Sequence, residues 1–173
     1  MKNLLFLFIF SLFFTIFCSA EDFHPDYFIG YSYSKIKNPK KYEFYTIMCD
    51  FSKPIKKSRK FFYQIEPYVS YVISPSDNFE IGVSGFLLYK FNESDFQPYF
   101  KIGTGIIYLS TDFIEQSTHF NFASSIGLGF KFKLKKFSIY GEGRLRHVSN
   151  AGIKEPNEGI NSKIFLSGIE YNF

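Results

Sequence analysis

Apolar and polar residues alternate with a period of two over long stretches of the chain. In residues 119–133 the even positions are mainly Phe, Ile and Leu, whereas the odd positions are Asn, Ala, Ser, Gly and Lys. The same alternation recurs in 61–73, 79–91 and 97–109. A period of two is typical of a β-strand with one apolar face, and no segment after the first 20 residues has a clear period of 3.6. The pattern predicts an all-β protein.

Weaker copies of the pattern bring the number of predicted strands to eight. They occupy 27–35, 41–51, 137–149 and 161–173, and turn-like segments separate the strands. Strands of a soluble sandwich usually contain about five to six residues, whereas the predicted strands reach the roughly 9 to 11 residues of a tilted membrane-crossing strand. We therefore predict an eight-stranded antiparallel transmembrane β-barrel.

The start of the chain has the pattern of a secretory signal peptide. Lys2 precedes the apolar stretch Leu4–Phe17, and Cys18-Ser19-Ala20 provides small residues before Glu21. The apolar stretch contains 14 residues, fewer than the ~20 that a membrane-spanning helix needs. We expect cleavage after Ala20, which leaves residues 21–173 as one barrel domain outside the cytoplasm.

The aromatic residues and the chain end favour the bacterial outer membrane. The sequence has 25 Phe, 13 Tyr and no Trp, and the Tyr and Phe residues cluster near strand ends, as an interfacial girdle requires. Ile169, Tyr171 and Phe173 alternate at the end of the chain, a pattern that resembles the assembly signal of Gram-negative outer-membrane barrels. An even number of strands puts both termini on one side, which we expect to be the periplasm.

The charges fit a membrane barrel and not a nucleic-acid-binding protein. The net charge is only +4, and no Lys/Arg stripe is interleaved with aromatic residues, so nucleic acid is not an expected partner. Glu66, Lys101, Glu142 and Arg144 fall on the faces opposite the apolar ones, where we expect paired charges to fill a narrow barrel.

Two polar residues fall on a face that should be apolar. In 137–149 the odd positions match the lipid face, and these include His147 and Ser149. One explanation is that both lie in the headgroup zone, where polarity costs little. The other is a serine nucleophile whose proton is taken by a neighbouring imidazole.

The segments around these residues resemble one known family. His147-Val148-Ser149-Asn150-Ala151-Gly152 is followed by Pro156-Asn157-Glu158-Gly159, and the spacing His-x-Ser-Asn-Ala-Gly and Pro-Asn-x-Gly resembles the PagL family of lipid A deacylases. Residues 99–109, 120–132 and the terminal strand are also similar to the family. The resemblance implies an outer-membrane esterase that removes the 3-O-acyl chain of lipid A, the lipid anchor of lipopolysaccharide.

The resemblance also implies roles for individual residues. Ser149 would be the nucleophile, His147 the general base and acid, and Asn157 a donor to the oxyanion, with Asn150 helping to shape that site. Asn161 stands where the best-known pattern of the family has Glu. An amide can orient an imidazole but gives its positive form no charge support, and replacing the acid of a serine triad can cost ~10⁴ in rate. The substitution supports the alternative of an inactive barrel with a structural or adhesive role.

Strand pairing predicts a place for the acyl chain. If Ser149 lies opposite Asn161, the antiparallel register puts Gly143 opposite Ser167. These two residues are small, and Gly141 continues the same outward face. A shallow groove would therefore enter the lipid there. The alternative is that the glycines only allow the barrel to curve.

The residue types present suggest no metal and no cofactor. His24 and His119 lack partners at metal-ligand spacing and are expected at the membrane interface. The expected partners are lipid A and the outer membrane itself, and a homodimer is left open.

Overall fold

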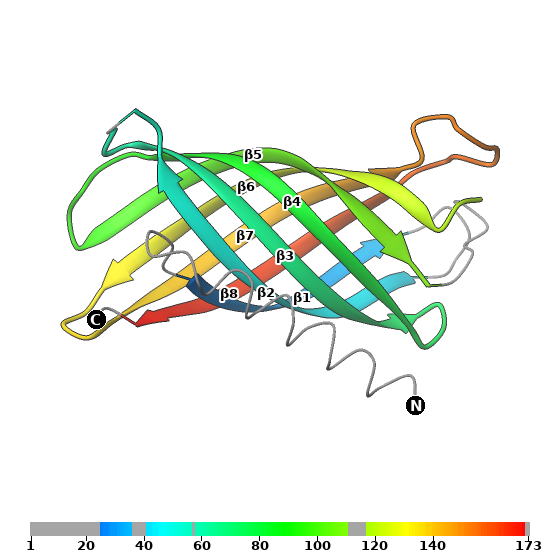
Figure 1. The fold of residues 1–173 in the computed structure, drawn as a ribbon. Coiled ribbons are helices and arrows are strands. Elements are labelled where there is room, and N and C mark those ends of the chain that lie inside the picture. The colour runs from blue at the N-terminus through cyan, green and yellow to red at the C-terminus, as the bar shows by residue number, and fades with distance from the viewer. Residues whose placement is uncertain (1–24, 36–40, 57, 111–116, 172–173) are drawn as a thin grey trace.

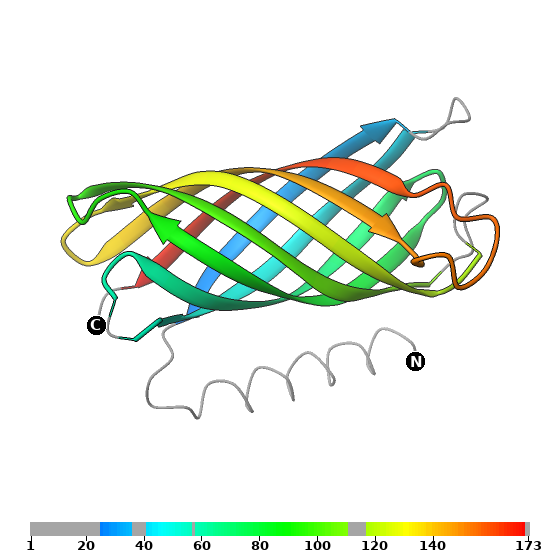
Figure 2. The same ribbon diagram turned by 90° about the horizontal axis from the view of Figure 1, so that it is seen from above.

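The structure is a computed structural model that describes residues 25–35, 41–56, 58–110 and 117–171. The predicted signal peptide, residues 1–20, and Phe173 lie outside the described residues. Eight antiparallel strands pair in chain order and β1 closes on β8, so the sheet is a closed barrel (Figures 1 and 2). The strands are β1 Pro25–Lys35, β2 Lys41–Pro54, β3 Phe61–Ser74, β4 Asn78–Lys90, β5 Phe96–Leu109, β6 Phe120–Lys133, β7 Phe137–Ser149 and β8 Ile160–Tyr171.

The predicted strand ends agree with the structure to within three residues. The largest difference is in β2, which continues to Pro54 because Ser52 and Lys53 still pair with β3. Proline is tolerated there because it occupies the strand end, where its missing N–H interrupts no central ladder. Among the described residues, no helix is long and apolar enough to cross a membrane.

Side chains alternate between the lumen and the outer surface as the sequence pattern predicted. In β6, Phe120 and Leu128 are 70% and 62% exposed, whereas Asn121 and Ala123 are 2% and 1% exposed. Closure explains why this arrangement suits a membrane, since every strand has two hydrogen-bonded neighbours and no edge faces lipid.

Aromatic side chains gather near both ends of the barrel, as predicted. We call the end with the β1–β2, β3–β4, β5–β6 and β7–β8 connections the loop end, and the other the turn end. Phe61 and Tyr89 pack at the turn end with ring centroids 4.8 Å apart. Tyr108 packs on Phe120 at the loop end, with centroids 5.1 Å apart. Rings that are apolar in body and polar at the tip suit these two interfaces.

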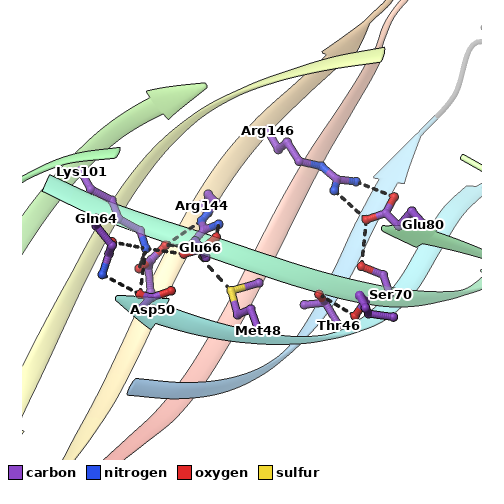
Figure 3. A network of polar contacts seen from close by, with 12 residues as sticks. Thr46, Met48, Asp50, Gln64, Glu66, Ser70, Glu80, Lys101, Arg144 and Arg146 are labelled. Carbon is purple, nitrogen blue, oxygen red and sulfur yellow. Dashed lines mark hydrogen bonds and ion pairs between the residues drawn. The ribbon is translucent and has the colours of Figure 1, made fainter. Parts of the chain in front are cut away.

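A cluster of buried charged side chains lies inside the barrel (Figure 3). Lys101 Nζ lies 2.9 Å from Glu66 Oε2 and 3.0 Å from Glu142 Oε2. Arg144 pairs with the same two carboxylates, and its Nη2 lies 2.8 Å from Glu66 Oε2. The predicted placement of these four residues in the barrel interior is confirmed.

A second ion pair lies closer to the loop end, beside a cluster of buried apolar side chains. Arg146 Nη1 is 2.7 Å from Glu80 Oε1, and Tyr42 donates to Glu80 Oε2 at 2.6 Å. Buried apolar residues pack beside this pair: Phe44, Val72, Ile107, Leu109, Val148 and Ile160.

The central cluster leads to a stability prediction. Glu66 is 0% exposed and contacts two cations, so Glu66→Gln leaves buried positive charge without its partner. Breaking a buried pair in this way costs about 3 to 5 kcal/mol. We expect the urea midpoint of the folded gel band, measured in phospholipid vesicles, to fall accordingly. Glu93→Gln is the matched control, because its pair with Arg59 is exposed and such pairs contribute less than about 1 kcal/mol. Equal midpoints for the two variants would contradict the prediction.

Candidate active site

A row of polar side chains crosses the outer surface near the loop end. Thr104, Ser124, His147 and Asn161 follow one another in register across β5, β6, β7 and β8. Partners in an antiparallel ladder point to the same face of the sheet, and all four side chains are exposed. His147 and Asn161 thus face outward, as predicted.

The imidazole of His147 is held by Asn161. His147 Nδ1 lies 2.8 Å from Asn161 Oδ1. Because an amide oxygen can only accept, Nδ1 carries the hydrogen of this bond, and in the neutral ring Nε2 is then the nitrogen with the free lone pair. The neighbour from β8 therefore selects the tautomer in which Nε2 can accept a proton.

The predicted register between β7 and β8 is wrong by two residues. His147, and not Ser149, lies opposite Asn161, so Leu145 faces Lys163 and Gly141 faces Ser167. A shift of two leaves every side chain on its predicted face, because the side-chain period is also two. The connection 150–159 has hydrogen bonds of its own, and the alternation of the strands does not encode its path.

Ser149 is the last residue of β7 and shares the outward face with His147. It is half-buried and lies opposite Phe122 of β6. Its hydroxyl forms no hydrogen bond with another described residue. Two positions along a strand span about 6.8 Å, so the two side chains are neighbours whose direct contact depends on their rotamers.

The β7–β8 connection orients the amide of Asn157. The backbone N–H of Asn150 donates to Asn157 Oδ1 at 3.0 Å. With its oxygen engaged, Asn157 keeps an Nδ2 group that has no hydrogen-bond partner among the described residues. Asn157 is therefore a free donor near the end of β7.

Asn150 is used within the same connection. It is fully buried, its Nδ2 donates to the carbonyl of Lys154 at 2.6 Å, and its Oδ1 accepts the N–H of Gly152 at 2.9 Å. Ser117, before β6, joins the connection by donating its hydroxyl to the Lys154 carbonyl at 2.9 Å. Asn150 thus positions Asn157 through its backbone and secures the loop through its side chain.

Gly159 lies against the ring of His147, a contact that the sequence did not predict. Its φ is +74°, and a Cβ at this position would lie 2.6 Å from His147 Cε1. Only glycine combines this backbone conformation with so close an approach to the ring. The signal was present in the Pro-Asn-x-Gly spacing, but a single glycine does not reveal what packs on it.

His119 lies away from this site. His119 Nδ1 is 2.8 Å from the carbonyl oxygen of Leu109, and its ring stacks on Tyr108; His24 lies outside the described residues. Within the described ranges, no group of three or more His, Cys, Asp or Glu side chains is arranged to hold a metal ion.

An open groove of about 600 Å³ passes beneath His147 and Asn161 on the outer surface. Its lining includes Ile102, Ser124, Ile126, Leu145 and Lys163. Ser124 and Lys163 had not been singled out from the sequence.

The groove is displaced from the surface that strand pairing had suggested. Gly141, Gly143 and Ser167 do not line it. The ring of Phe130 lies 2.6 Å from where a Cβ of Gly141 would be, whereas Gly143 has no atom within 4 Å of that point. The surface over Gly143 is thus open, and the surface over Gly141 is covered.

Solved structures share this architecture. The chain is similar to the crystal structure of the outer membrane enzyme PagL, with a TM-score of 0.64 and 19% identity over 82% of this chain and 97% of that one. It is also similar to Neisserial surface protein A, with a TM-score of 0.69 and 12% identity over 88% and 98% of the two chains. The N-terminal barrel domain of Pseudomonas aeruginosa OprF gives a TM-score of 0.50 and 11% identity over 87% and 99%. At these identities the likeness concerns the fold.

The sequence itself carries a family match. Residues 30–170 match the family described as lipid A 3-O-deacylase (PagL), while no curated protein matches the chain significantly. This match runs from β1 to β8 and includes the polar row and the β7–β8 connection. The protein belongs to the PagL family of lipid A 3-O-deacylases, and its barrel is that of a bacterial outer-membrane protein.

Proposed function

We propose that this protein is an esterase that hydrolyses the ester-linked 3-O-acyl chain of lipid A, with Ser149 as nucleophile. The observation that carries the proposal is the His147–Asn161 hydrogen bond beside an apolar groove, with Ser149 on the same outward face. We further propose that both termini are periplasmic. The loop end then lies in the outer leaflet, where lipid A is found.

His147 activates the nucleophile in this proposal. Nε2 takes the hydroxyl proton as Ser149 Oγ forms a bond to the ester carbonyl carbon, and the carbonyl electron pair moves to its oxygen. Asn161 keeps the imidazole in the tautomer that can accept this proton. The Ser149 side chain must turn toward Nε2 when substrate binds, since hydrogen bonds of a free site often form fully only in the complex.

Asn157 stabilises the negative oxygen that forms in this step. Its Nδ2 is the donor, and the backbone N–H of Asn150 holds the amide by donating to its oxygen. The intermediate collapses by breaking the bond between the acyl carbon and the sugar 3-oxygen, which takes the proton from His147 Nε2. Water then attacks the acyl-serine by the same sequence and releases the fatty acid. No step needs a metal or a cofactor.

In this proposal the acyl chain enters the groove directly from the membrane. Ile102, Ile126 and Leu145 face lipid below the polar row, so a hydrocarbon chain loses no apolar contact when it enters. We propose that the chain continues over Gly143, where the surface is open. The substrate therefore reaches Ser149 without leaving the bilayer.

A second candidate function is that of an inactive structural or adhesive barrel. Two observations favour it: Asn161 gives the imidazole no negative charge, and the Ser149 hydroxyl makes no bond to His147 among the described residues. Mass spectrometry of lipid A from cells with and without the protein separates the two functions. Loss of one 3-hydroxyacyl group supports the esterase, and identical lipid A supports the inactive barrel.

The first prediction of this mechanism concerns the nucleophile and the base. Ser149→Ala or His147→Ala should abolish release of the 3-hydroxy fatty acid from purified lipid A. Both residues face outward at a strand end, so we expect the heat-modifiable gel shift of the folded barrel to remain. Full activity of Ser149→Ala would exclude it as the nucleophile, and loss of the gel shift would assign it a structural role.

The second prediction concerns the orienting amide. Asn161→Ala removes the acceptor for His147 Nδ1 and should lower kcat by ~10² to 10⁴. Asn161→Glu restores an acceptor and adds charge support for the imidazolium, so it should retain or raise kcat. An unchanged kcat in Asn161→Ala would remove this residue from the mechanism.

The third prediction uses two glycines of the β7–β8 connection. Gly159→Ala should lower kcat because the new methyl group displaces the His147 ring. Gly152→Ala is the matched control: its φ is +77°, so it bears a similar backbone strain, but no atom lies within 4 Å of its Cβ position. If both variants lose activity equally, backbone strain and not the imidazole contact explains the effect.

A further inference from the structure

Lys163 is a cation on the lipid-facing surface of β8. It lies opposite Leu145 of β7 and Tyr33 of β1, and its side chain is exposed. A lysine on the lipid face of a barrel costs up to about 2 to 4 kcal/mol near the bilayer midplane and progressively less toward the interface. The cost of a charge at such a position is offset when the charge binds a ligand.

Lys163 has no ion-pair or hydrogen-bond partner among the described residues. The carboxylate that shares its row is Glu43, two strands away on β2, and it lies 3.8 Å from Lys41. The polar neighbour on its own strand face is Asn161, which is neutral and bound to His147. This charge is therefore available to a ligand, unlike the cations of the central lumen cluster.

The residue lies on the border between two kinds of surface. The row toward the loop end is polar and contains Ser124, His147 and Asn161. In its own row the neighbours on β6 and β7 are Ile126 and Leu145. All of these residues, Lys163 included, line one groove. The polar row suits the headgroup of a lipid, and the apolar row suits its acyl chains. Lys163 therefore lies at the level where headgroup and acyl chains meet.

We propose that Lys163 binds a phosphate group on the sugar headgroup of the substrate, so that the site selects phosphorylated glycolipids. This inference rests on the proposed function. A lysine side chain is long enough to reach from its strand position toward the polar row while its methylene groups remain against apolar surface. A partly desolvated ammonium attracts a phosphate more strongly than one in bulk water. The contact would fix the sugar while the ester carbonyl lies near Ser149.

Kinetics on two substrates test this assignment. The full-length barrel is refolded in detergent micelles and given lipid A that carries its phosphates, or the same lipid A after enzymatic removal of the phosphates. Lys163→Gln should raise KM for the phosphorylated substrate about tenfold or more, since one hydrogen bond to a charged group contributes about 1.5 to 3 kcal/mol, with kcat unchanged. It should leave KM for the dephosphorylated substrate unchanged, and Lys163→Arg should restore most of the affinity.

A matched variant controls for general surface charge. Lys41→Gln removes one exposed cation from β2 at the loop end, outside the groove, and should leave both KM values unchanged. Equal effects of Lys163→Gln on the two substrates, or none, would overturn the proposal. The same KM increase in Lys41→Gln would overturn it too, because the effect would then arise from net charge.

A binding measurement separates this inference from the proposed function. Ser149→Ala and Ser149→Ala/Lys163→Gln proteins are titrated with both lipids, which requires no turnover. Tighter binding of the phosphorylated lipid that is lost in the double variant supports the phosphate site even if the wild-type protein cleaves neither lipid. Equal binding of both lipids by both proteins overturns it even if the esterase is active.

Discussion

The closed hydrogen-bond ladder is the constraint on which this molecule depends. In hydrocarbon, an unpaired backbone N–H or C=O group costs several kcal/mol, and pairing β1 with β8 removes the last open edge. Once the ladder is closed, each residue has only two directions, the lumen or the lipid. The charged, polar and apolar residues are sorted by that single choice.

The sorting places charge in two very different settings. Inside, Lys101 and Arg144 share the carboxylates of Glu66 and Glu142, so a narrow lumen is filled by charges that satisfy one another. Outside, His147, Asn161 and Lys163 stand on a surface that otherwise contacts acyl chains. A substrate that is itself a membrane lipid can reach such a site by lateral diffusion.

The site combines a rigid part and a loop-built part. The ladder fixes the backbone of His147 opposite that of Asn161, and the resulting hydrogen bond defines the imidazole tautomer. The loop supplies Asn157 as a donor and Gly159 as the surface on which the imidazole packs. In the proposed mechanism, the strands therefore determine where the proton goes, and the connection between them determines where the negative oxygen is stabilised.

The sequence by itself determined the number of strands, their approximate ends, the inward or outward direction of nearly every side chain and the family. A period-two pattern carries this information because it is local and is repeated in every strand. The resemblance of the His-x-Ser-Asn-Ala-Gly and Pro-Asn-x-Gly segments to the PagL family also pointed to His147, Ser149, Asn157 and Asn161. Only the tertiary structure decided that Asn161 faces His147 and not Ser149, that Gly159 packs on the imidazole, and that Lys163 and Ser124 line the groove. These facts depend on the register between strands and on the path of the 150–159 connection. A shift of two residues leaves the alternation unchanged, so the pattern along one strand cannot report which residue of its neighbour lies beside it.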